Sequence, residues 1–114
     1  DEYDAEVLGL LGEIYLQESE GDDIALRFCE KAVELSPDSL DLKIRLAKAQ
    51  TYCGDLIAAG KTLQPCLRNK RTRLAALKQK AIIAREQGRE NTANAWQQKA
   101  RQFAENIEGR KQDD

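Results

Sequence analysis

The sequence contains no histidine and no methionine. Without histidine, the chain lacks the commonest general base of enzymes and the commonest nitrogen ligand of zinc. It also has no glycine-rich loop that could hold phosphate groups, and its only three serines stand near the ends of expected helices. We therefore expect a protein that is not an enzyme and that has no metal ion and no cofactor.

Cysteine is scarce as well. Cys29, Cys53 and Cys66 are an odd number of thiols, and no two of them form a Cys-x-x-Cys pair. This spacing suits neither a disulfide framework nor a zinc site. We expect them to be small buried apolar side chains in a reducing compartment, the cytoplasm. A reactive thiol is the alternative, and the lack of histidine removes the usual group that would activate it.

Long apolar runs are missing too. No stretch approaches the roughly 18 apolar residues of a membrane span, so we expect no membrane insertion. No basic segment followed by an apolar run precedes the folded pattern, which predicts that no targeting peptide is present. The first residue is aspartate. We expect the chain to be a fragment of a longer protein.

The charges are unevenly distributed, although the net charge is only −2. Through Asp41 there are 13 acidic and two basic residues, whereas from Leu42 onward there are 16 basic and seven acidic residues. The chain is thus an acidic first third followed by a basic remainder. Because 41% of the residues are hydrophobic, it can still build a core.

Small residues recur at an interval of 34 residues, which indicates an internal repeat. Four series share this interval: Ala25, Ala59 and Ala93; Ala32, Cys66 and Ala100; Ala47 and Ala81; Gly54 and Gly88. Four coincident series are difficult to obtain by chance. They predict one domain over residues 1–114, with repeats over about 5–39, 40–73 and 74–107 and a polar tail over 108–114.

Apolar residues between these markers recur every three or four positions, the pattern of an amphipathic helix. The six expected stripes are Val7, Leu8, Leu11, Ile14 and Tyr15; Ala25, Phe28, Cys29, Ala32 and Val33; Leu42, Leu46, Ala49 and Cys53; Leu56, Ala59, Leu63, Cys66 and Leu67; Leu74, Leu77, Ala81 and Ala84; and Ala93, Trp96, Ala100, Phe103 and Ile107. No run alternates with a period of two, and only 5% of residues are aromatic, so we expect no strands. The fold class is all-α.

Glycines and polar residues mark the expected helix ends. Gly21, Gly54 and Gly88 each fall between two stripes, where a glycine can end a helix in the left-handed conformation. Asp22 or Asp23, Asp55 and Asn91 stand where N-caps are expected, and the segment 36–39 closes the first helix pair. Gly60 and Pro65 lie inside the fourth helix, which we therefore expect to be kinked or short.

These residues resemble the tetratricopeptide repeat family over roughly residues 5 to 107. The matching positions are Leu8, Leu11, Gly12, Tyr15, Ala25, Ala32 and Pro37 in the first repeat; Leu46, Ala47, Gly54 and Ala59 in the second; and Ala81, Gly88, Ala93 and Ala100 in the third. The resemblance implies an α-solenoid of three antiparallel helix-turn-helix pairs, stacked as a right-handed superhelix. A bulky side chain at Ala59 would wedge a helix crossing apart.

The resemblance also implies a concave groove, lined by the first helix of each pair, that binds a peptide or helix of another protein. Its groove positions correspond to Glu6, Gly9, Glu13, Leu16 and Gln17; Asp41, Ile44, Arg45, Lys48, Thr51 and Tyr52; and Ala75, Lys78, Gln79, Ile82, Arg85 and Glu86. As partner-binding residues we expect Glu13, Gln17, Arg45, Lys48, Tyr52, Lys78, Ile82 and Arg85. This groove would be acidic at one end and basic from Arg45 to Arg85, which favours an acidic partner and a role as scaffold, adaptor or assembly factor.

One specialised use of the family is not expected. Some members are co-chaperones that hold the C-terminal carboxylate of heat-shock chaperones with lysine, asparagine and arginine. The matching positions here are Gly9, Glu13, Arg45, Ala75 and Gln79, and none of them carries the family's residue. Glu13 would repel a carboxylate. The heat-shock chaperone terminus is therefore excluded as the expected partner.

Two further interpretations remain open. In the first, the acidic end of one module meets the basic end of another, and the chain forms a homo-oligomer. In the second, the basic run Arg68, Lys70, Arg71 and Arg73 between the fourth and fifth helices binds nucleic acid. No aromatic residue interrupts that run, and the isoelectric point of 5.3 is far from that of basic DNA-binding domains. A solvated turn is the favoured interpretation of these four residues.

Overall fold

The computed structural model describes residues 2–18 and 22–113, and within them the protein contains six helices and no strands. The helices are α1 (Glu2–Gln17), α2 (Asp22–Leu35), α3 (Leu40–Tyr52), α4 (Leu56–Arg68), α5 (Lys70–Glu86) and α6 (Glu90–Asp113). The prediction of an all-α fold is confirmed. Gly21, expected to end the first helix, lies outside the described residues. The expected polar tail is part of α6, whose helical backbone continues to Asp113.

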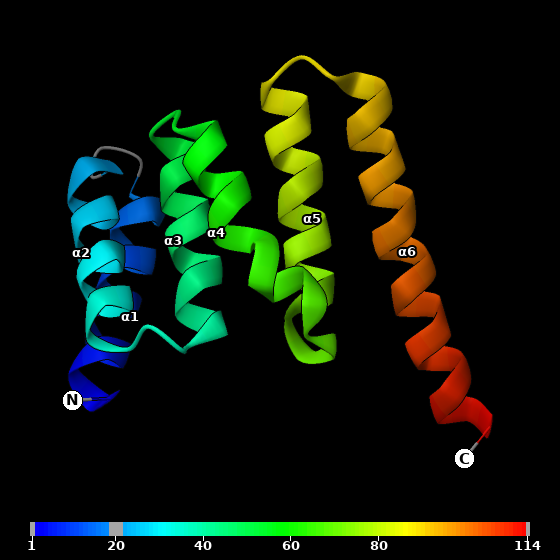
Figure 1. Ribbon diagram of the computed structural model, residues 1–114, viewed down its shortest axis with the longest axis horizontal. Helices are drawn as coiled ribbons and strands as arrows, with labels where there is room; N and C mark the ends of the chain where they lie inside the picture. Colours follow the sequence, from blue (N-terminus) through cyan, green and yellow to red (C-terminus); the bar gives the residue numbers. More distant parts are fainter. Residues whose placement is uncertain (1, 19–21, 114) are drawn as a thin grey trace.

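Consecutive helices run side by side in opposite directions, as Figure 1 shows along the whole chain. In addition, α3 contacts both α1 and α5. Within the described residues, the backbone of α4 approaches neither α2 nor α6. The molecule measures 41 × 36 × 23 Å, and its radius of gyration is 14.7 Å. A compact chain of this length would have a radius of gyration of about 13 Å, so the shape is slightly extended.

Most helix ends follow the expected local rules. Gly54 and Gly88 have φ angles of 84° and 78°, the left-handed conformation that ends a helix at little cost in glycine. The Asp55 side chain accepts a hydrogen bond from the backbone N–H of Ala58 at 3.3 Å and caps α4. Asn91, expected as an N-cap, instead lies inside the first turn of α6, which begins at Glu90.

A single residue, Asn69, joins α4 to α5. Its extended backbone, with φ −103° and ψ 126°, ends one helix and begins the other. The Asn69 side chain accepts a hydrogen bond from the Arg71 N–H at 2.9 Å and caps α5. The segment expected to be an inter-helix turn is therefore mainly the first turn of a helix, and α5 begins at Lys70, before the repeat boundary expected after residue 73.

The small residues of the 34-residue pattern form the helix contacts. Ala25, Ala59 and Ala93 are completely buried, and every other alanine and cysteine of the four series is at most 4% exposed. The central core cluster surrounds Leu63, a side chain with no exposed surface. Helices α3, α4 and α5 all contribute to this cluster, so the core continues from one helix pair into the next.

The buried face of α1 differs from the expected stripe. Val7 and Ile14 were expected in the core, but 38% and 52% of their surfaces are exposed. The buried residues of α1 are Ala5, Gly9, Gly12 and Leu16. The apolar side chains of α1 occupy several faces of the helix, and the face that is buried is the one that allows the neighbouring helices to come closest.

The two glycines of α1 mark these close approaches. A Cβ atom added at Gly12 would lie 2.5 Å from Cys29 Sγ and 3.2 Å from the backbone oxygen of Ala25, both on α2. A Cβ atom at Gly9 would lie 2.6 Å from Leu42 Cδ2 on α3. A larger residue at Gly12 would therefore push α1 away from α2, whereas at Gly9 the side chains of Leu42 and Arg45 would have to move.

Helix α4 is continuous despite Gly60 and Pro65. It has 13 residues, as many as α3, so it is not shortened relative to the helix before it, and the kink stays a prediction. Pro65 removes the N–H that would bond to the carbonyl of Lys61. Lys61 is exposed, so water can hydrate the carbonyl that the proline leaves without its helical partner.

Candidate binding groove

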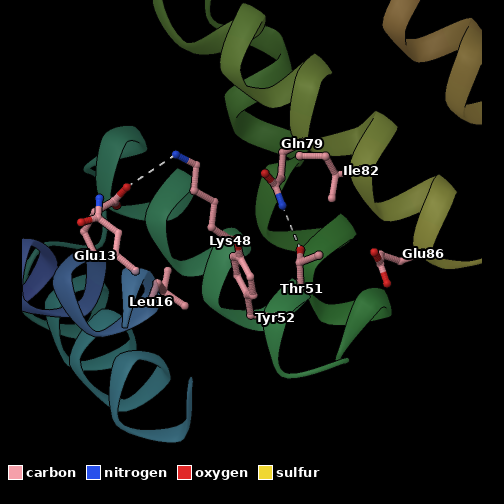
Figure 2. A pocket seen from close by; sticks show the side chains of 9 residues that line it. Glu13, Leu16, Lys48, Thr51, Tyr52, Gln79, Ile82 and Glu86 are labelled. Atoms are coloured by element: carbon pink, nitrogen blue, oxygen red, sulfur yellow. Dashed lines mark hydrogen bonds and ion pairs between the residues drawn. The ribbon is translucent and has the colours of Figure 1, made fainter. Parts of the chain in front are cut away.

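Helices α1, α3 and α5 form a groove with a hollow of about 430 Å³, and Figure 2 shows the side chains around it. The residues that line it are Glu13, Leu16, Gln17, Lys48, Thr51, Tyr52, Gln79, Ile82 and Glu86. All nine are among the groove positions that the family resemblance implies. They come from three helices that are not consecutive in the chain, because α3 lies between α1 and α5 and contacts both.

The eight expected partner-binding residues lie around three adjoining hollows. Glu13, Gln17, Lys48, Tyr52 and Ile82 line the groove hollow. A second hollow, of about 530 Å³, lies over α1, α3 and α5 and is lined in part by Arg45, Glu13 and Lys48. A third hollow, of about 370 Å³ between α5 and α6, is lined in part by Lys78, Ile82 and Arg85. The expected site is therefore one continuous surface of which Arg45, Lys78 and Arg85 form the flanks.

The groove hollow has apolar walls. Tyr52 and Ile82 are 65% and 46% exposed, whereas Leu16, which lines the α1 side of the hollow, is only 7% exposed. Tyr52 is the last residue of α3, Cys53 caps the helix, and the chain then turns away through Gly54. Helix packing thus leaves an aromatic ring and an isoleucine exposed to solvent in the hollow, together with a buried leucine.

The polar part of the groove connects α3 and α5. The amide Nε2 of Gln79, a residue that is 5% exposed, donates a hydrogen bond to Thr51 Oγ1 at 3.1 Å. Thr51 Oγ1 in turn donates to the backbone oxygen of Ala47 at 2.7 Å. Because these groups satisfy one another, they fix the distance between two groove helices and leave the floor largely apolar.

The expected run of positive charge is partly neutralised within the chain. Glu13 of α1 lies between two cations of α3, with Oε2 3.5 Å from Arg45 Nε and Oε1 3.8 Å from Lys48 Nζ. Glu13 Oε2 is buried and makes no hydrogen bond. These contacts are long, so they are chiefly electrostatic. The groove near α1 and α3 is therefore mixed in charge rather than basic.

Two further carboxylates pair with cations that line the second and third hollows. Asp41 pairs with Arg71 at 2.9 Å, and Glu90 pairs with Arg85 at 3.4 Å. Among the described residues, Lys78 and Arg101 in the third hollow have no ion pair. The uncompensated positive charge therefore lies at the α5 and α6 end of the surface.

Some of the basic residues around the start of α5 also make contacts within the chain. Arg71 pairs with Asp41, while Arg73 Nε donates a hydrogen bond to the backbone oxygen of Leu67 at 2.8 Å. The Arg73 guanidinium also lies over the Phe103 ring, 5.3 Å from its centroid. Arg68 and Lys70 are exposed. Two of the four cations are thus engaged in contacts within the chain, which weakens a nucleic-acid site here.

Two of the three thiols have the environment of core residues, whereas Cys53, also expected to be buried, is only half-buried. Cys29 and Cys66 are buried, and none of the three cysteines is in a disulfide. Burial, with a further contribution from the carboxylate of Glu13, raises the pKa of the Cys29 thiol to about 11. Burial also raises the pKa of Cys53 and of Cys66. All three thiols are therefore protonated at pH 7, which disfavours a nucleophilic role.

No protein-family model matches the chain, and no curated protein matches it either. Among the described residues, no cluster of three or more cysteine or carboxylate side chains is placed to hold a metal ion. In that same part of the chain, no helix combines the length and the apolar character that crossing a membrane requires.

Proposed function

We propose that this protein is a non-catalytic module that binds a peptide or a helix of another protein in the groove of α1, α3 and α5. The observation that carries the proposal is the hollow of about 430 Å³ that is lined by the exposed Tyr52 and Ile82 and the buried Leu16. Exposed aromatic and aliphatic side chains in a concave surface are typical anchors for a partner segment. Such a module would act as a scaffold, adaptor or assembly factor.

The architecture that suits this function is a right-handed α-solenoid of the tetratricopeptide repeat kind. Its support is the 34-residue spacing of buried small residues and the contacts of α3 with both α1 and α5. In such a stack each helix pair covers the apolar side of the next, and the first helices of the pairs line one surface. The protonated, unpaired thiols suit a reducing compartment such as the cytoplasm.

The groove sets the chemistry of the partner. Tyr52 and Ile82 favour an apolar side chain at the centre, whereas Lys78 and Arg101 favour acidic residues toward α5 and α6. Near α1, Glu13 already occupies the cations of α3, so acidic groups gain little there. The preferred ligand is a segment with an apolar anchor followed by acidic residues, not one that is acidic throughout.

The test compares two isoleucines that are equally exposed. Ile82 in the groove is 46% exposed, and Ile24 on α2, outside all of the hollows described, is 47% exposed. The wild-type protein should first be used to capture its partners from a lysate of the source organism. The segment of a partner that binds should then be made as a synthetic peptide, and its affinity measured by calorimetry. Ile82→Glu should weaken its binding at least tenfold, the loss expected for a central apolar anchor, and Ile24→Glu should not.

Circular dichroism of both variants would verify that the helices are intact. A peptide that binds Ile82→Glu as tightly as the wild type would place the binding surface elsewhere. Charge reversal provides a second check, because Lys78→Glu should reduce the affinity for a peptide with acidic residues but not for its amide counterpart. Equal loss for both peptides would contradict the assigned chemistry.

Self-association is a second candidate function, favoured by the exposed apolar face of α1. Leu10 and Ile14 are each 52% exposed and Val7 is 38% exposed, on a helix that also carries Glu6 and Glu13. The hollow between α5 and α6 has the complementary character, with basic residues around an apolar floor. The occupant would be α1 of a second copy, in a head-to-tail contact.

Sedimentation at low and high salt tests this candidate. Head-to-tail contacts should give oligomers that grow with protein concentration and dissociate in high salt, and Ile14→Glu should abolish them. Ile24→Glu is again the control. A wild-type monomer at both salt concentrations and at every protein concentration would refute self-association and leave the groove proposal unaffected.

A further inference from the structure

A fourth hollow, of about 430 Å³, lies over α4, α5 and the start of α6. It uses a different face of α5 from the groove: Lys80, Ile83 and Gln87 line the hollow, whereas Gln79, Ile82 and Glu86 line the groove. Its volume is within the range of small-molecule sites.

The charges around this hollow are all positive. Lys61 of α4, Lys80 of α5 and Arg89 before α6 line it, and none of the described residues that line it is acidic. None of the three cations forms an ion pair within the described part of the chain, in contrast to Arg45, Lys48, Arg71 and Arg85. Three like charges around one hollow repel one another and attract an anion.

The hollow also presents hydrogen-bond donors and an apolar wall. Gln64 and Gln87, whose side-chain amides can donate hydrogen bonds, also line it. Ile57, which is 72% exposed, and the half-buried Trp96 form part of its lining. The Lys80 ammonium lies 5.6 Å from the centroid of the Trp96 ring.

Gly60 keeps the space beside Lys80 open. A Cβ atom added there would lie 3.6 Å from Lys80 Nζ, so a side chain longer than alanine would extend toward the ammonium group. The glycine that weakens α4 thus leaves room next to one of the three cations of the hollow. Nothing in the packing of the core requires it, because no other atom lies within 4 Å of that Cβ position.

We infer that this hollow binds a small organic phosphate, with the phosphate group at Lys61, Lys80 and Arg89 and its apolar group against Ile57 and Trp96. A phosphate monoester carries nearly two negative charges and three terminal oxygens, which suits three cations and two amide donors better than a carboxylate with two oxygens. This site is independent of the groove that binds a partner protein.

Trp96 makes the inference directly measurable, because it is the only tryptophan of the chain. Phenyl phosphate, titrated at constant ionic strength, should produce a saturable change in tryptophan fluorescence and shift the side-chain amide resonances of Gln64 and Gln87. Inorganic phosphate should bind at least severalfold more weakly, because it lacks the apolar group. Lys80→Gln and Lys61→Gln should each raise the Kd about tenfold, as expected for one charge-assisted contact.

The matched control is Lys99→Gln. Lys99 lies 4.8 Å from the Trp96 centroid but does not line the hollow, so its removal alters the fluorophore's surroundings and should leave the Kd unchanged. Lys48→Gln, in the groove, should leave it unchanged as well. The inference is wrong if phenyl phosphate does not saturate below about 10 mM, beyond the weak end of specific binding, or if Lys80→Gln and Lys61→Gln bind like Lys99→Gln. Equal binding of inorganic phosphate would overturn the assignment of an organic ligand.

Discussion

Replacing Gly12 by alanine should destabilise the protein, whereas the same substitution at Gly60 should stabilise it. Both glycines lie inside helices, where alanine is favoured over glycine by about 1 kcal/mol. The added Cβ atom meets different surroundings. At Gly60 the nearest atom is Lys80 Nζ at 3.6 Å, an ordinary contact, whereas at Gly12 the atom Cys29 Sγ would be only 2.5 Å away.

The difference between the two variants isolates the steric cost. Normal contacts between non-bonded atoms are about 3.5–4.0 Å, so at Gly12 the overlap is roughly 1 Å, and the backbone oxygen of Ala25, at 3.2 Å, is also closer than an ordinary contact. Overpacking of this kind costs about 1–3 kcal/mol. Because the gain in helix propensity is common to both variants, it cancels, and the free energies of unfolding should differ by about 1–3 kcal/mol.

Urea denaturation followed by circular dichroism would measure this difference. With a denaturant slope of about 2 kcal/mol per M, the two midpoints should be roughly 1 M apart. Cys29→Ala removes the sulfur atom that Gly12→Ala meets, so in the double variant the two substitutions should cost less than the sum of their separate effects, by at least about 0.5 kcal/mol. Equal increases in midpoint for Gly12→Ala and Gly60→Ala would refute the close approach of α1 and α2.

Three other substitutions test the fold. Ala59→Leu should lower the free energy of unfolding by about 1–3 kcal/mol, because Ala59 is fully buried in the central core cluster; an unchanged melting midpoint would exclude a tight helix crossing there. Asn69→Ala should cost about 1 kcal/mol in urea denaturation through loss of the cap on Arg71 N–H, and a neutral result would contradict the one-residue junction. The Cys29 thiol has a pKa of about 11 in the folded protein against an ordinary 9.0, so the thiol of the unfolded chain loses its proton first, and the free energy of unfolding falls as the pH rises from 9 to 11. Cys29→Ala should make this fall smaller. Parallel pH profiles for the variant and the wild type would rule out the raised pKa.

The helices and their contacts were largely predictable from residue spacing. Glycine at positions 54 and 88 has few roles in a helical pattern other than to end a helix, and a repeated alanine such as Ala59 indicates a crossing. The buried face of α1 was not predictable from hydrophobicity, because its apolar residues surround the helix. The informative signal was the set of small residues, with Gly9 and Gly12 facing two neighbouring helices. Close packing depends on size as well as on polarity.

The groove was predictable in position but not in charge. Its residues are among the positions that the family resemblance implies, whereas the pairing of Glu13 with Arg45 and Lys48 joins residues more than 30 positions apart in the sequence. Asp41 and Arg71, which also pair, are 30 positions apart. A count of charges along the chain separates an acidic from a basic part, but folding brings members of the two parts together. Within the groove surface, the region near Lys78 retains the positive charge that the count suggests.

Each contact between helices joins neighbours in the chain or helices separated by only one other. The loops that must close before any contact forms are therefore short, and their entropic cost is small. Such sequence-local topologies fold quickly. During synthesis on a ribosome, each helix would find its partner as soon as the next helix emerges. Within the described residues, the backbone of α6 approaches that of α5 alone, so we expect the last helix to detach and reattach more readily than the other five.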